Sequence, residues 1–138
     1  MKLLTQSLLA ASLSISSFCY ADVAVVVNSA NASAVSDSEI SRVFLGKLKK
    51  FSSGDSVTPV NSKMGGAVRN EFEQKVLRKS SSQVKAYWSK LVFSGKGKPP
   101  KEFGSDAEVL QFVAANPGAI GYVDAASVND TVKVLKTF

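Results

Sequence analysis

The stretch VTPVNSKMGGAVRNEF, residues 57–72, passes from a strand-like segment through two glycines into a helix-like segment. VTPV is typical of a strand, and Pro59 favours either a sheet edge or a strand end. Gly65 and Gly66 permit backbone angles that other residues avoid, and apolar residues recur after them at helical spacing. A strand that turns tightly into a helix is typical of α/β folds.

The segments on both sides continue this alternation. Upstream, the run VAVVV at 23–27 is typical of a buried strand, and a capping-box spacing at Ser36 and Glu39 opens a helix that stops at Gly46. Downstream, we expect helices over 84–92 and 105–116 and strands over 119–123 and 132–135. This order predicts one α/β domain, a small mixed sheet flanked by about four helices.

Residues 1–21 have the pattern of a secretory signal peptide. Lys2 is followed by an apolar, serine-diluted stretch that ends in small residues. The serines disfavour a membrane span, so we expect cleavage between Ala21 and Asp22 and no stable membrane insertion afterwards. The mature domain would then be residues 22–138, located in the periplasm and without cysteine, since Cys19 is the only one.

The composition argues against an enzyme. The 138 residues include 17 Lys or Arg, 11 Asp or Glu and no His, which gives a net charge of +6. Without His, a conventional Ser-His-Asp triad cannot form and most zinc sites lack their usual ligand. We therefore expect no catalytic residues, no cofactor and no metal site.

The turn at residues 61–69 is the best candidate binding site. Peptide N–H groups at the start of a helix attract anions, glycines let a ligand approach the backbone, and nearby cations add charge. The predicted ligand-binding residues for phosphate or a similar small anion are Ser62, Lys63, Gly65, Gly66 and Arg69. The alternative is that the glycine pair only provides the turn that starts the helix.

Other basic and aromatic residues have structural explanations. Lysines cluster loosely at 47–50, 75–85 and 96–101, but they are spread over several elements, so we expect a solvated surface and no nucleic-acid partner. Tyr87 and Trp88 lie on an apolar helical stripe with Val84, Leu91 and Val92, which favours core packing over a ligand pocket.

Three segments resemble the substrate-binding protein of the phosphate-specific ABC transporter. They are ISRVFLGKLKKF at 40–51, YWSKLVFSGKG at 87–97 and NPGAIGYVDAA at 116–126, and the similarity extends over about 23–126. The resemblance implies a periplasmic solute receptor of the type 2 periplasmic-binding-protein-like fold, in which two lobes close around phosphate. This chain would be a single lobe, completed by a second copy or by a partner protein.

The sequence departs from that family at the anion-binding turn. The resemblance implies an arginine and a Ser-Gly-Thr run there, but this chain has Asn61 or Ser62 at the first place and residues 66–68, Gly-Ala-Val, at the second. Two functions remain open. One is binding of a small anion for an ABC-type phosphate uptake system, with its permease as partner; the other is an envelope protein-interaction module that has lost phosphate binding.

Overall fold

The computed structural model describes residues 22–138, so the predicted signal peptide lies outside the described residues. The strands are β1 (Val23–Asn28), β2 (Thr58–Ser62), β3 (Lys101–Phe103), β4 (Ala119–Asp124) and β5 (Val132–Thr137). The helices are α1 (Asp37–Phe44), α2 (Ala67–Phe72), α3 (Ser81–Phe93) and α4 (Asp106–Ala115). A π-helical turn, η1 (Glu73–Leu77), continues α2, and a short 3-10 turn, η2 (Ala125–Ser127), follows β4.

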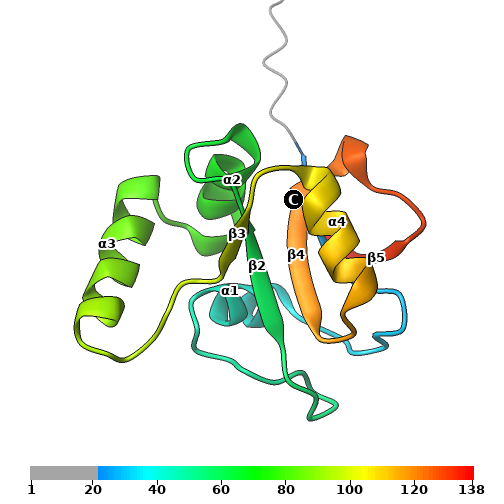
Figure 1. The fold of residues 1–138 in the computed structure, drawn as a ribbon, viewed down its shortest axis with the longest axis horizontal. Helices are drawn as coiled ribbons and strands as arrows, with labels where there is room; N and C mark the ends of the chain where they lie inside the picture. The colour runs from blue at the N-terminus through cyan, green and yellow to red at the C-terminus, as the bar shows by residue number, and fades with distance from the viewer. Residues whose placement is uncertain (1–21) are drawn as a thin grey trace, which may run out of the picture.

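The strands form one mixed sheet in the order β3-β2-β4-β1-β5. β2 runs parallel to both β3 and β4, whereas β1 runs antiparallel to β4 and β5. α4 covers one face of the sheet, and α1 and α2 cover the other, with α3 standing to one side (Figure 1). The predicted α/β class, with a small mixed sheet and four helices, is confirmed.

Side chains of β1 alternate between the two cores. Val23, Val25 and Val27 pack with α1, α2 and α3, while Ala24 and Val26 pack with α4. This double burial explains why β1 is apolar at consecutive positions, as strands covered on both faces usually are. The larger core is centred on Phe44, Phe72 and Tyr122, and the Phe72 and Tyr122 rings stack with centroids 3.7 Å apart.

Capping residues fix where α1 and α4 begin. The predicted capping box at Ser36 and Glu39 is present, since each side chain bonds the backbone N–H of the other residue. At α4, Ser105 Oγ accepts the Glu108 N–H, but the Glu108 carboxylate accepts the Gly104 N–H instead. α4 can approach the sheet closely because Gly121 lies beneath it, where a Cβ would come within 2.8 Å of Val109 Cγ1.

Three details differ from the sequence analysis. β2 is not an edge strand, because β3 pairs with it from Val60 onward. Pro59 lies before that pairing, so of the two alternatives given for Pro59 the strand end fits. β3 lies between the expected helices over 84–92 and 105–116, where the sequence analysis predicts no strand. Val92 is 53% exposed rather than part of the core, although Trp88 and Val84 are buried as expected.

Candidate functional site

The predicted anion site is a tight turn between β2 and α2. Gly65 has φ +78°, a left-handed conformation that other residues rarely adopt, and the Gly66 N–H donates to the Lys63 carbonyl at 3.1 Å. Gly66 is the N-cap residue of α2 and offers no side-chain acceptor. The glycine pair therefore shapes the turn, and the Gly66 N–H is already used within it.

Ser62, at the end of β2, is committed to the core. Its Oγ donates to the Tyr122 carbonyl at 3.2 Å, and its N–H donates to the Tyr122 hydroxyl, also at 3.2 Å. The Tyr122 hydroxyl in turn donates to Asn61 Oδ1 at 2.9 Å. Burial raises the pKa of the Tyr122 phenol well above its usual range, so it stays a neutral donor. This polar network anchors β2 to β4.

Arg69 is buried, whereas an arginine that is free to bind an external anion would be accessible to solvent. Only 4% of the residue is exposed, and its Nη1 donates to the Ser62 carbonyl at 3.3 Å. Its Nε lies 3.6 Å from a carboxylate oxygen of Glu73, which is also buried and accepts a hydrogen bond from Ser81 Oγ. Arg69 therefore links the end of β2 to η1 through its guanidinium.

A carboxylate of the chain itself lies at the turn. Glu102, on β3, accepts the Met64 N–H at 2.9 Å through one oxygen and lies 3.2 Å from Arg69 Nη1 through the other. Parallel pairing of β2 with β3 places Glu102 opposite Asn61 and so beside the turn. An oxyanion thus occupies the position that the sequence analysis predicted for an external anion.

The sequence analysis missed Glu102, although a signal was available. Glu102 is the only acidic residue within 74–105, a segment that contains eight Lys or Arg. A carboxylate forms strong charge-assisted hydrogen bonds with Lys or Arg side chains, so this acid was a candidate for such a pair. Its partner could not be predicted, because β3 itself was not predicted.

Two of the predicted residues keep a free donor. Within residues 22–138, the Lys63 ammonium and the Gly65 N–H form no hydrogen bond, and both residues are exposed. The structure thus brings Lys63, Gly65, Gly66 and Arg69 together around the turn, while the Ser62 hydroxyl is directed to β4. Two carboxylates, the buried Glu73 and the partly exposed Glu102, face one guanidinium here, which opposes entry of a second anion while Glu102 stays in place.

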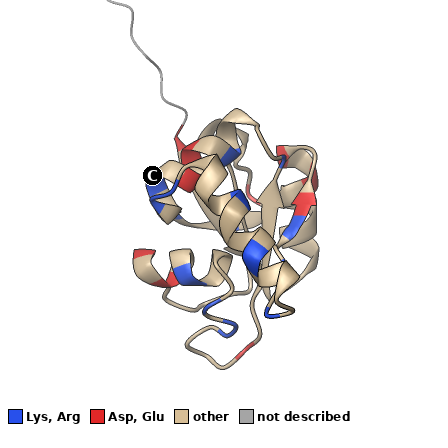
Figure 2. Cartoon of the chain, turned by 90° about the vertical axis from the view of Figure 1, so that its left-hand side faces the viewer, with Lys and Arg blue, Asp and Glu red and all other residues tan. Residues whose placement is uncertain are grey.

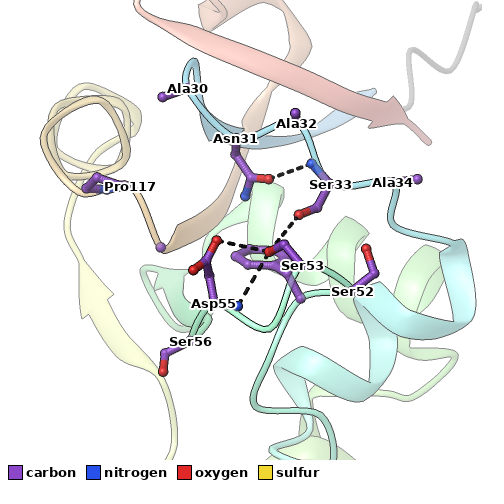
Figure 3. A pocket seen from close by; sticks show the side chains of 12 residues that line it. Ala30, Asn31, Ala32, Ser33, Ala34, Ser52, Ser53, Asp55, Ser56 and Pro117 are labelled. Carbon is purple, nitrogen blue, oxygen red and sulfur yellow. Dashed lines mark hydrogen bonds between the residues drawn. The ribbon is translucent and has the colours of Figure 1, made fainter.

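A second hollow lies at the opposite end of β2, before the strand begins (Figure 3). Its volume is about 590 Å³, and hydroxyl and amide groups line it, including Asn31, Ser33 and Ser53. Ser53 Oγ donates to Asp55 at 3.0 Å, and the Ser33 N–H donates to Asn31 Oδ1 at 2.9 Å. No Lys or Arg lines this hollow, and Asp55 adds negative charge, so it does not suit an anion.

Other kinds of site are not seen in the described part of the chain. Among residues 22–138, no group of three or more His, Cys, Asp and Glu side chains is arranged to hold a metal ion. In the same range, no helix has the length and apolar character needed to cross a membrane.

Comparison with known proteins gives a family and a fold. Residues 9–137 match a family model described as the PBP superfamily domain. No curated protein matches the chain. Solved structures do match, at low sequence identity.

Three of the solved structures illustrate the match. An ABC-type phosphate transport receptor from Vibrio cholerae has a TM-score of 0.66 at 18% identity, over 86% of this chain and 48% of the receptor. A chain from Clostridium perfringens solved with bound phosphate has a TM-score of 0.64 at 17% identity, over 85% of this chain and 46% of that chain. PstS from Borrelia burgdorferi has a TM-score of 0.59 at 11% identity, over 83% of this chain and 47% of PstS. The chain spans about half of each structure and corresponds to a single lobe of the type 2 fold.

Proposed function

We propose that this chain, which belongs to the PBP superfamily, is a single-lobe solute-binding module for phosphate or a similar small anion. The proposed location is the periplasm, reached through cleavage of residues 1–21, and the proposed context is an ABC-type phosphate uptake system. Structures of similar fold include a phosphate transport receptor and a chain with bound phosphate, which supports this choice of solute.

One observation carries the proposal. The turn between β2 and α2 holds a carboxylate, that of Glu102, between the Met64 N–H and the Arg69 guanidinium. Charge-assisted hydrogen bonds of this kind suit phosphate oxygens as well as carboxylate oxygens. The proposed contacts for an external anion are the Met64 N–H and Arg69, with Lys63 and the Gly65 N–H as the free donors beside them.

Glu102 would then compete with the solute. Its side chain is tethered to β3 and remains 43% exposed, so it can be displaced without unfolding the core. While it is in place, it fills the donors and repels a second anion. We therefore expect the wild-type protein to bind phosphate weakly, and removal of the Glu102 charge to strengthen binding.

Calorimetric titration with phosphate tests this proposal on the wild-type protein and on E102Q. E102Q keeps the shape of the side chain and removes its charge, so its phosphate affinity should rise at least about tenfold, within the range for a charged hydrogen bond. The matched control is E108Q, because Glu108 also accepts a backbone N–H, from Gly104, but lies at the start of α4. Its affinity should equal that of the wild type.

The same observation favours one alternative. A chain that fills its anion site with its own carboxylate could have lost solute binding and kept the fold as an envelope protein-interaction module. In that case neither the wild-type protein nor E102Q would release or absorb heat with phosphate at low ionic strength. That result would reject the solute-binding proposal and leave the interaction module.

A further inference from the structure

A groove opens between the turn and α3, and its chemistry differs from that of a phosphate site. Its volume is about 490 Å³, and its walls are mainly apolar, with Val84, Trp88, Val92, Phe93 and Pro99 among the lining residues. Phosphate would occupy only a small part of this space. Pockets of this size with apolar walls and few polar groups are typical of sites for small organic ligands.

The polar groups of the groove are mostly cationic. Arg69 and Lys85 both line it, together with Ser89. Arg69 is buried and already pairs with Glu73 and Glu102, so Lys85 is the accessible cation of the groove. Lys85 is exposed on α3, in the acid-free segment 74–101. Figure 2 views the molecule from the side of α3 and shows Lys and Arg positions there, together with Asp and Glu positions of other elements. An acidic ligand group would therefore meet the Lys85 ammonium, for which no carboxylate within residues 22–138 is a partner.

The apolar wall is unusually exposed for a protein surface. Phe93, the last residue of α3, is 95% exposed, and Met64 and Val92 are each about half exposed. The occupant that satisfies both the charge and the exposed apolar surface is an organic acid with an apolar chain.

We propose that this groove binds an amphipathic monocarboxylate, with the carboxylate at Lys85 and the apolar chain against Trp88 and Phe93. The inference rests on the proposed role of the chain as a solute-binding lobe and extends the solute class from a bare anion to an organic acid. Trp88 is the only tryptophan of the sequence, so its fluorescence reports directly on the groove.

Titration of the purified protein with decanoate and with an ω-bromo fatty acid tests this proposal. The bromo acid should quench Trp88 in a saturable manner, and decanoate should reverse the quenching. Acetate lacks the chain and decanol lacks the charge, so neither should compete at the same concentration. Competition by decanol equal to that by decanoate would overturn the proposed role of the carboxylate.

Surface variants localise the binding. F93S and K85Q should each weaken decanoate binding about tenfold, since burial of a Phe side chain or loss of a charged hydrogen bond has that magnitude. The matched controls are V134S and K133Q on β5, because Val134 is also an exposed apolar residue and Lys133 an exposed lysine. Equal losses in the controls, or no saturable quenching of Trp88, would overturn the proposal.

Phosphate calorimetry separates this inference from the proposed function. Phosphate binding without decanoate binding would reject the groove and keep the anion-binding lobe. Decanoate binding without phosphate binding in either the wild-type protein or E102Q would reject phosphate as the solute and keep the groove.

Discussion

At the scale of a single residue, Arg69 supports the turn between β2 and α2. Its guanidinium neutralises Glu73, which is buried with it, and bonds the Ser62 carbonyl at the end of β2. A buried ion pair contributes little net stability, but loss of one partner leaves an uncompensated charge in the core. Arg69 is therefore a structural residue as well as a candidate ligand for anions.

We predict that R69A lowers the free energy of unfolding by about 3–5 kcal/mol, because Glu73 is left buried without its partner. Urea denaturation measures this change. The double variant R69A/E73A should be more stable than R69A alone, since it removes the unpaired carboxylate too. A double variant less stable than R69A would show that the charge of Glu73 is not the cause. R69A is thus unsuitable as a binding test, and E102Q is preferable.

At the scale of elements, the contact between α4 and the sheet depends on a glycine, which has no side chain to separate them. Gly121 of β4 lies beneath α4, and an added Cβ would meet Val109 and Val60 at 2.8 and 3.1 Å. The two valines belong to different elements that are both fully packed, so neither can move freely.

We predict that G121A destabilises the fold by about 1–3 kcal/mol, the usual range for overpacking a core. G97A is the matched control, because a Cβ there would lie 3.7 Å from the Trp88 ring, an ordinary contact distance. Thermal unfolding of both variants measures the difference. Equal stability of G121A and G97A would mean that α4 can shift away from β4 at little cost.

Elements with a local signal were predicted well from the sequence. β1, α1, α3 and α4 follow from β-branched runs, caps and apolar periodicity, and each of these signals lies within one segment. β3 was missed because its three residues are largely exposed and carry no alternation; its only support is pairing with β2. The same long-range pairing brings Glu102 to the turn, so the most informative contact of the candidate site was hidden from a local analysis.

At the scale of the whole molecule, the chain has one lobe where its structural relatives have about twice the length. The turn between β2 and α2 opens at the surface, with Lys63 and Gly65 exposed. An enclosed receptor replaces the hydration shell of its anion with many protein donors, whereas an open lobe leaves part of that shell in place. Electrostatic attraction in an open site is screened by salt.

We predict that phosphate binding to E102Q weakens steeply as ionic strength rises from about 0.01 to 0.1 M, because the Debye length falls from about 30 to 10 Å over that range. Calorimetry at several sodium chloride concentrations measures this dependence, with choline chloride as a check that ionic strength rather than sodium is responsible. An affinity that stays constant would contradict an open site and indicate that the anion is enclosed. Enclosure requires a second lobe, so sedimentation in phosphate would then have to show two copies of the chain closing on one another.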